Sequence, residues 1–346
     1  MTAPTPETTR TRVLRWEAGI RADSAMYSRI TRGVADNEQI LRLIEVAPPG
    51  QLEMNLLLAA VQYLLIAEPD QPLARWYPSL GGTEVDGDVA SEFTTFVVAN
   101  EEAITGLIST RRVQTNEVGR CTFLLPAYNL VSRLSRRPIA LLEIGTSAGL
   151  TQNLDRYGYQ YVSDSATVDL SPTSLVQLTS STGMTVPEPA RTIPDIVWRA
   201  GIDLYPVDIS DDDQVRWLRA LVWPDRVDRH QRLEAAIELA RAHPPTIVAG
   251  DAVDDLAGMV AAAPPDAAVI IQHSYVLNQL ARTDRERFMD LLDELGATRS
   301  VYRVGAESLA RSPRTTLDLT VHGAARKSRV LADVHHHGAW IRWAAG

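Results

Sequence analysis

The order of apolar and polar positions divides the chain into a helical first part and an alternating second part. Up to about residue 136, apolar residues recur with the helical period and no β-branched cluster interrupts them. Asn37 precedes Ile40 and Ile44, which a helix places on one face, and its side chain is suited to cap that helix. The pattern predicts helices over residues 12–21, 26–34, 37–46, 51–67, 90–109 and 124–134.

From Pro138 onward, short apolar runs alternate with longer amphipathic stretches such as Val227–Arg241. Near-continuous apolar strands that alternate with helices are typical of a parallel sheet covered on both faces, so the fold class is α/β. The last two runs have no helical pattern between them, which predicts an antiparallel hairpin at one sheet edge. The predicted strands cover residues 139–144, 196–202, 246–249, 267–271, 300–304, 315–321 and 338–343.

These two patterns predict two domains. Residues 1–136 would form an all-helical domain that covers the substrate site, and residues 137–346 would form the sheet domain. Residues 158–195 are rich in Ser, Thr and Pro and are too long for a simple connection. We expect them to form either a substrate lid or an inserted hairpin.

Composition narrows the class of partner. The formal net charge is −9 and no run of Lys or Arg exceeds two residues, so we expect no nucleic-acid and no membrane partner. The single cysteine, Cys121, excludes an internal disulfide and fits a reducing, cytoplasmic compartment. The apolar run Leu56–Ile66 is far shorter than the roughly 20 residues of a membrane span. The oligomeric state stays open, with a homodimer as one alternative.

The most informative segment is the turn after the first predicted strand, Glu143-Ile144-Gly145-Thr146-Ser147-Ala148-Gly149. Gly145 and Gly149 permit a tight turn and a close ligand approach, and the start of the expected helix would suit an anionic group. The alternative is a plain strand-to-helix turn whose glycines serve only packing. Because no Lys follows the second glycine, a phosphate-binding P-loop is excluded.

Two other enzyme classes compete for this segment. The G-x-S-x-G spacing fits an α/β-hydrolase with Ser147 as nucleophile, followed by Asp251 and a histidine near residue 335. That class normally has several strands before its nucleophile, yet the chain before residue 139 is helical in pattern. A dinucleotide oxidoreductase is disfavoured because G-x-G-x-x-G is absent.

The same segment resembles the first motif of class I S-adenosylmethionine-dependent methyltransferases, with Ser147 in place of the usual middle glycine. The resemblance covers residues 137–346 and rests on the order of several short motifs. The whole chain, with its Trp223-Pro224-Asp225 segment, is also similar to an uncharacterised bacterial domain family. The resemblance implies a Rossmann-like, seven-stranded sheet and an enzyme that transfers a methyl group from S-adenosylmethionine to a small-molecule acceptor.

The resemblance also implies the residues that hold the cofactor. Asp203 would accept hydrogen bonds from the ribose hydroxyls, with Asp208 as second choice, and Asp251 would lie near the adenine amino group. A solvated strand end for Asp203 and a helix cap for Asp251 are the alternatives. The implied cofactor-binding set is Glu143, Gly145, Ser147, Gly149, Asp203, Asp251 and Gln272.

Histidines are the candidates for proton transfer. His273 leaves the fourth strand of the motif order and titrates in a useful range, so we predict it to be the base, with a hydroxyl as the preferred acceptor. A packing histidine is the alternative. His335 and His337 would share one side of an extended chain and could supply the base; we predict no bound metal. Glu307, just beyond the fifth strand, could meet the acceptor. A cofactor-binding protein without turnover is the remaining alternative.

Overall fold

The computed structural model describes residues 7–171, 173–308, 314–323 and 325–344. The chain forms two compact units. The helical unit comprises the residues up to Thr115 together with Asp211–Gln231, and the sheet unit comprises Asn116–Ser210 and Arg232–Gly346. This division differs from the predicted single boundary after residue 136, because the last predicted helix belongs to the sheet unit and a later segment returns to the helical unit.

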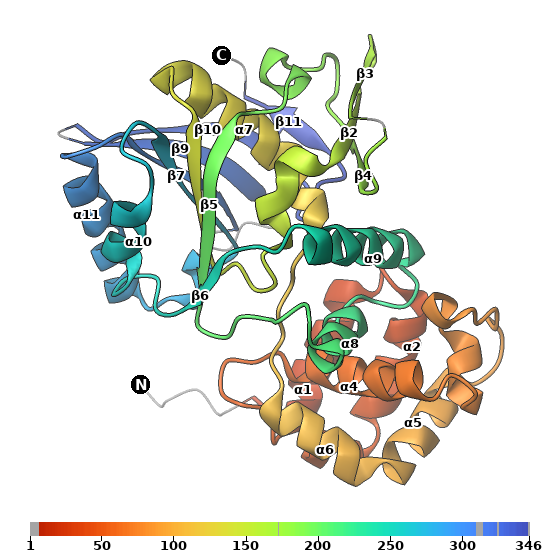
Figure 1. Ribbon diagram of the computed structural model, residues 1–346. Helices are drawn as coiled ribbons and strands as arrows, with labels where there is room; N and C mark the ends of the chain where they lie inside the picture. Colours follow the sequence, from red (N-terminus) through yellow and green to blue (C-terminus); the bar gives the residue numbers. More distant parts are fainter. Residues whose placement is uncertain (1–6, 172, 309–313, 324, 345–346) are drawn as a thin grey trace. The chain divides into compact units, whose positions relative to one another are not determined.

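The helical unit follows the predicted helices closely (Figure 1). Asn37 caps its helix by accepting a hydrogen bond from the Ile40 N–H at 3.1 Å, as predicted. The predicted helix over residues 90–109 is two helices, separated at Asn100. The elements are α1 (Thr9–Ile20), α2 (Ala25–Ala35), α3 (Glu38–Ile44), α4 (Glu53–Ala67), η1 (Pro72–Trp76), η2 (Pro78–Leu80), α5 (Val89–Ala99), α6 (Glu101–Thr110) and α8 (Asp212–Ala220).

Helix α8 completes the core of the helical unit although it lies far along the chain. Trp217 and Ala220 are buried in the same hydrophobic core as α4. The Trp217 indole donates to the Arg112 carbonyl at 2.9 Å, and the Gln62 amide donates to the Val222 carbonyl at 2.9 Å. The boundary between the units falls within α9 (Val227–Ala242).

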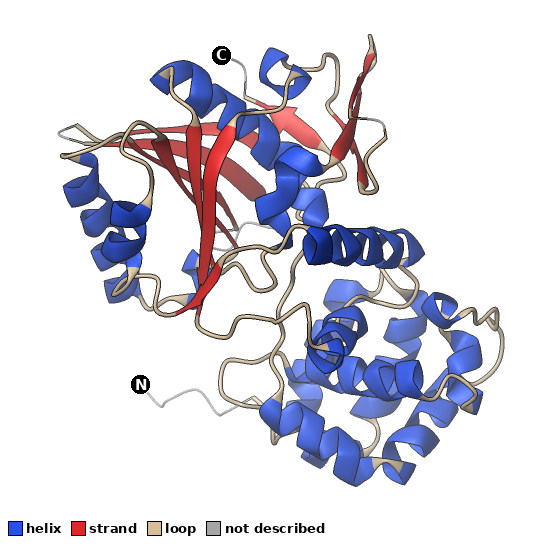
Figure 2. Ribbon diagram, in the orientation of Figure 1, coloured by secondary structure: helices blue, strands red, loops and turns tan. Residues whose placement is uncertain are grey.

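Across the described residues of the sheet unit, eight strands form the main sheet in the order β11-β10-β9-β8-β7-β1-β5-β6. Figure 2 shows the strands in red with helices packed beside them. Strands β6, β5, β1, β7 and β8 run parallel, in the strand order of doubly wound α/β sheets. The bounds are β1 (Ile139–Ile144), β5 (Ile196–Asp203), β6 (Ile247–Ala249), β7 (Ala268–Ser274), β8 (Val301–Glu307), β9 (Thr315–His322), β10 (Lys327–Val334) and β11 (Ile341–Trp343).

The prediction of seven strands is wrong, because β10 was not anticipated. The residues Lys327–Val330 at its start are exposed and show no apolar alternation. Strand β10 lies between β9 and β11 and is antiparallel to both, so the predicted edge hairpin is a meander.

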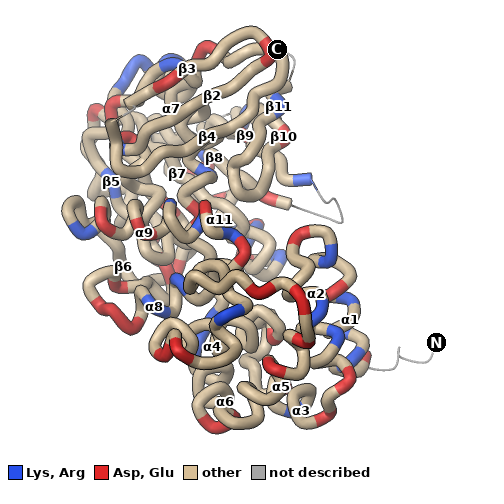
Figure 3. Tube along the Cα trace, turned by 90° about the vertical axis from the view of Figure 1, so that its right-hand side faces the viewer, with Lys and Arg blue, Asp and Glu red and all other residues tan. Residues whose placement is uncertain are grey.

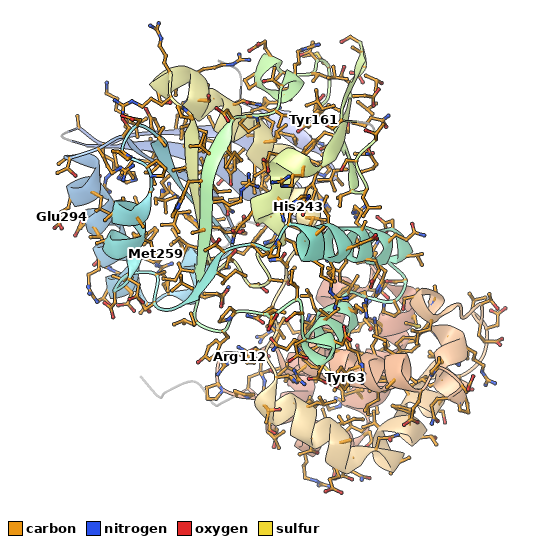
Figure 4. All side chains as sticks on the ribbon, in the orientation of Figure 1. Tyr63, Arg112, Tyr161, His243, Met259 and Glu294 are labelled. Carbon is orange, nitrogen blue, oxygen red and sulfur yellow. The ribbon has the colours of Figure 1, made fainter. Side chains whose placement is uncertain are left out.

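Helices cover the two faces of the main sheet. Leu142 and Ile144 of β1 share a core with α10 (Leu256–Ala262) and α11 (Arg282–Gly296), whose residues Met259 and Glu294 are labelled in Figure 4. Because side chains alternate along a strand, Glu143 points to the opposite face, which packs against α7 (Cys121–Ser135).

The connection from β1 to β5 departs from the expected helix. It begins with a 3-10 helix, η4 (Leu150–Arg156), and continues as a second sheet, which in the described residues has three strands. In this sheet the Tyr161 hydroxyl donates to the Thr122 carbonyl of α7 at 2.8 Å, so the segment is fixed to the sheet unit. Residues 158–195 thus contain a hairpin and one further strand: β2 (Gly158–Val162), β3 (Thr167–Leu170), β4 (Gln177–Ser181) and then η5 (Glu188–Arg191).

Acidic and basic residues are mixed along the chain. Figure 3 shows acidic and basic positions interspersed along the traces of both units. Among the helices of the described residues, none is long and apolar enough to cross a membrane.

Candidate ligand site at the carboxyl edge of the sheet

The candidate site lies where the parallel strands of the main sheet end. After β1 the chain forms β5 and β6 on one side and then β7 and β8 on the other, so the sheet has its topological switch point beside β1. Sheets of this kind bind ligands outside the strand ends at that point. The residues found there are the glycine loop (residues 145–149), Asp203 at the end of β5, the β7 turn (residues 274–277) and Glu307 at the end of β8.

The glycine loop has an alternating backbone. Gly145, Ser147 and Gly149 have φ angles of 68°, 52° and 67°, so every second residue is left-handed. A residue with a side chain resists this conformation by roughly 1–2 kcal/mol. Ser147 therefore occupies a position that favours glycine, and its N–H donates to Asp203 Oδ2 at 2.8 Å.

Packing explains the two glycines. A Cβ atom on Gly145 would lie 2.5 Å from Cγ2 of Val276, and one on Gly149 would lie 2.7 Å from Cβ of Pro245. The close approach at both positions is thus made by the protein's own side chains, as in the packing alternative.

Ser147 is different. Its side chain is 4% exposed, and within the described residues its hydroxyl has no hydrogen-bond partner. A buried polar atom without a partner is destabilising, so this hydroxyl is a ready contact for a ligand or an ordered water.

Asp203 joins the glycine loop to the end of β5. Oδ2 accepts the Ser147 N–H and Oδ1 accepts the Tyr205 N–H, both at 2.8 Å. Each oxygen keeps acceptor capacity for a further donor. Asp208, the second choice, accepts from Ser210 within its own turn.

Glu143 and Gln272 support the loop from inside the sheet. Glu143 is buried and accepts hydrogen bonds from the hydroxyls of Thr146, at 2.7 Å, and Thr151. Burial raises its pKa from 4.5 to about 7. Gln272 is its neighbour on β7 and donates to the Ser274 hydroxyl at 2.8 Å. Both side chains hold hydroxyl groups of neighbouring residues, Glu143 those of Thr146 and Thr151 and Gln272 that of Ser274.

The start of η4 offers less than the predicted helix N-terminus. The start of this helix was predicted to suit an anionic group, but the Leu150 N–H there donates to Asn116 Oδ1 at 3.1 Å. Asn116 also donates to the Thr146 carbonyl at 2.8 Å, so this residue braces the glycine loop. Asn116 precedes the helix predicted over residues 124–134, and it is part of no motif that would single it out in the sequence.

Asp251 caps a turn after β6. Its Oδ1 accepts the N–H groups of Val253, at 2.7 Å, and Asp254, at 3.2 Å. This agrees with the capping alternative in kind, although the residue directly before α10 is Asp255. The geometry leaves open acceptor positions on the Asp251 carboxylate.

The prediction that His273 is the base is not supported by its geometry. His273 is 0% exposed and lies on the face of β7 under Phe288 of α11. Its Nδ1 is 2.8 Å from Glu307 Oε1 and its Nε2 is 3.0 Å from Arg303 Nη1. Both ring nitrogens are engaged, and burial lowers the pKa of His273, so it agrees with the packing alternative.

His335 and His337 lie in a turn after β10, not along an extended chain. Their rings and that of His336 are within 6 Å of one another, centroid to centroid. Among the described residues, no group of three or more His, Cys, Asp or Glu side chains could hold a metal ion.

Arg120 links this histidine turn to the β7 turn. Its Nε donates to the His336 carbonyl at 3.2 Å, and its guanidinium lies 4.5 Å from the ring centroid of Tyr275. Tyr275 has a φ angle of 60° and its hydroxyl pairs with that of Thr315. Arg120 was missed from sequence; a lone charge before the apolar run of α7 was the available signal.

Glu307 has two unlike oxygens. Oε1 is 2.8 Å from His273 Nδ1 and accepts the N–H groups of Val276, at 3.0 Å, and Leu277, at 3.1 Å. Oε2 is buried and has no partner among the described residues. Burial alone would raise the pKa of Glu307, but the hydrogen bonds from His273 and the two backbone groups hold it below the ordinary value.

A serine-hydrolase triad is not assembled. Within the described residues no histidine bonds to the Ser147 hydroxyl, and Asp251 is engaged in its own turn. A nucleophilic serine needs a base within hydrogen-bond reach.

The mostly parallel sheet with helices on its faces and a switch point beside β1 makes this an α/β protein of the doubly wound type. The chain belongs to the family described as "Uncharacterized protein conserved in bacteria (DUF2332)", whose model matches residues 12–343. No curated protein and no solved structure matches the chain.

Proposed function

We propose that the protein is an enzyme that transfers a methyl group from S-adenosylmethionine to a small-molecule acceptor. The observation that carries the proposal is the pair Ser147 and Asp203 at the switch point. Ser147 is left-handed, its N–H donates to Asp203, and its buried hydroxyl has no partner in the part of the chain that the structure describes. The resemblance to methyltransferases implies that the cofactor binds beside these two residues.

The residues present fit an adenosyl cofactor at two positions. The Ser147 hydroxyl is able to donate one hydrogen bond to a ligand and to accept another. The Asp203 carboxylate is able to accept hydrogen bonds from a vicinal diol. Gly145, Gly149 and Glu143 would act by shaping the loop, Gln272 by fixing the end of β7, and Asp251 by its remaining acceptor positions. The cofactor would supply the methyl group on a positively charged sulfur.

The preference for a hydroxyl acceptor rested on His273 as the base. Because both nitrogens of His273 are engaged, that preference loses its support. His335 and His337 remain candidates for a base, through the contact of their turn with Arg120.

The test is calorimetric titration with S-adenosylmethionine and S-adenosylhomocysteine. Asp203→Asn is the informative variant, because the amide oxygen can still accept one backbone N–H while the charge is lost. We expect affinity for both ligands to fall about tenfold or more in Asp203→Asn. Asp266→Asn, at an exposed aspartate of the sheet unit outside the candidate site, is the matched control and should bind as the unchanged protein does. If the unchanged protein binds neither ligand, the proposed function is wrong.

A further inference from the structure

A row of buried and partly buried polar side chains crosses the main sheet beneath α11. Arg303 of β8 donates through Nη1 to His273 Nε2, at 3.0 Å, and through Nη2 to Asp318 of β9 and to Thr320 Oγ1. A side chain at Gly305 would lie 2.8 Å from Cε1 of His273, so the absence of a Cβ there makes room for the row. The row ends at Glu307, at the carboxyl edge.

The direction of the hydrogen bonds follows from chemistry. Arginine can only donate, so His273 Nε2 accepts and Nδ1 carries the proton that is donated to Glu307 Oε1. The Arg303 charge is paired with Asp318. Glu307 is therefore a carboxylate whose three partners, an imidazole N–H and two backbone N–H groups, are all neutral.

Among the described residues, two buried atoms of this row have no hydrogen-bond partner, Arg303 Nε and Glu307 Oε2, and of these Oε2 lies at the carboxyl edge of the sheet. The Glu307 side chain is 3% exposed, and among the described residues Oε2 has no donor. A buried carboxylate oxygen without a donor is destabilising, and a cationic donor offsets both its missing hydrogen bond and its charge. A hydroxyl would supply the hydrogen bond alone, and an anion would be repelled.

Glu307 is also tied to the glycine loop. Val276, whose N–H donates to Glu307 Oε1, places its Cγ2 against Gly145. Oε2 of Glu307 thus lies at the same edge of the sheet as Ser147 and Asp203.

We propose that Glu307 Oε2 receives an ammonium group of the bound ligand, with His273 as the residue that positions the carboxylate. The proposal rests on the proposed function for its choice of ligand. Two sources carry this group: the methionine part of S-adenosylmethionine, and an amine on the methyl acceptor.

The first arm of the test concerns the cofactor. Glu307→Gln removes the charge and keeps an acceptor oxygen for the N–H donors. If the ammonium group belongs to the cofactor, calorimetry will show about a tenfold to hundredfold weaker binding of S-adenosylhomocysteine and unchanged binding of 5′-methylthioadenosine, which lacks the amino-acid part. Glu294→Gln, an exposed glutamate of α11, is the matched control and should leave both affinities unchanged.

The second arm concerns the acceptor. Hexylamine, hexanol and hexanoate are titrated into the protein with and without saturating S-adenosylhomocysteine. If the acceptor supplies the ammonium group, hexylamine will be the one ligand of the three that binds. Its binding will be lost in Glu307→Gln. If circular dichroism shows that Glu307→Gln does not fold, Glu307→Asp replaces it in both arms. This variant keeps the charge but shortens the side chain. Glu307→Asp should bind the same ligands with lower affinity than the unchanged protein does.

The outcomes separate the two proposals. If Glu307→Gln binds both nucleosides as before and the unchanged protein does not prefer hexylamine, the ammonium site is wrong while the cofactor proposal stands. If the unchanged protein binds neither nucleoside, the cofactor proposal fails, and the amine series without nucleoside decides the role of Glu307.

Discussion

The backbone N–H of Ser147 donates to Oδ2 of Asp203 at 2.8 Å, and this bond joins the loop after β1 to the end of β5. The partner oxygen, Oδ1, holds the next turn of the chain at Tyr205. One aspartate therefore organises two of the segments that border the switch point, and its side chain should matter to stability even without a ligand.

Replacing Asp203 by Ala should lower the free energy of unfolding by about 2 kcal/mol, because two backbone N–H groups lose a charged acceptor. Asp203→Asn should lose less, since one acceptor oxygen remains. Urea denaturation measures both, with Asp266→Ala, at an exposed aspartate of the sheet unit, as the control. Equal stability of Asp203→Ala and the unchanged protein would contradict the role of this carboxylate in the loop.

Ser147 should tolerate glycine better than any branched residue. Glycine relieves the left-handed backbone but loses chain entropy on folding, so Ser147→Gly should change the free energy of unfolding by less than about 1 kcal/mol. Ser147→Val should lower it by about 2 kcal/mol, because a β-branched residue is disfavoured at positive φ. Denaturation of the two variants under the same conditions checks the contrast, and the reverse order of stability would refute it.

A serine-reactive fluorophosphonate should not label the protein at Ser147. The reason is that this hydroxyl has no histidine partner in the described residues and so is not activated. Intact-protein mass spectrometry before and after incubation is the measurement. Stoichiometric labelling that disappears in Ser147→Ala would restore the hydrolase interpretation.

Glu143 should make stability depend on pH. Its pKa is raised from 4.5 to about 7 in the folded protein, so the folded state holds a proton that the unfolded state has lost. The stabilisation is complete below about pH 4.5 and is lost as the pH rises through about 7. Glu143→Gln removes this loss, so its stability relative to the unchanged protein should grow by up to roughly 3 kcal/mol between pH 5 and pH 8. Urea denaturation at both pH values decides the matter, and a constant difference would show that Glu143 is already charged.

His273 should behave as a core residue. His273→Ala leaves Glu307 and Arg303 without their shared partner and should lower the free energy of unfolding by about 3 kcal/mol at pH 7. The exposed His243, labelled in Figure 4, is the control, and His243→Ala should stay within about 0.5 kcal/mol. A stable His273→Ala that lost only activity would return His273 to the role of base.

The pH dependence of the two buried groups has opposite sign. Because burial lowers the pKa of His273, its contribution to stability is present above about pH 6.5 and is lost as the pH falls. The Glu143 test therefore compares Glu143→Gln with the unchanged protein at each pH. Because both proteins contain His273, the pH dependence that His273 causes cancels in the difference.

The parallel strands could be predicted because burial on both faces leaves continuous apolar runs. Ile139–Ile144 is the clearest case, with every residue buried. Strand β10 could not be predicted in the same way, since its exposed first half follows no alternation. The small sheet of β2, β3 and β4 had no apolar run that exceeded those of ordinary loops.

Two differences at the site, those at His273 and Glu307, have a common cause, which is strand length. The predicted fourth strand ended at Ile271, but β7 continues to Ser274, and this extension carries His273 from the expected exit into the sheet interior. Strand β8 likewise continues to Glu307, so that a residue expected beyond the strand becomes its buried end. Backbone pairing between strands, which the sequence does not display, sets these limits.

The discontinuous helical unit has a consequence for synthesis of the chain. Trp217 and Ala220 of α8 belong to the core that α4 helps to form, so the first 115 residues leave the ribosome with part of that core missing. At ordinary rates of translation, the interval until residue 231 follows is on the order of 10 s. During that interval Tyr27 lacks its ring contact with Trp223 and the Gln62 amide lacks the Val222 carbonyl, so the helical unit can complete its core only after this later segment has been synthesised.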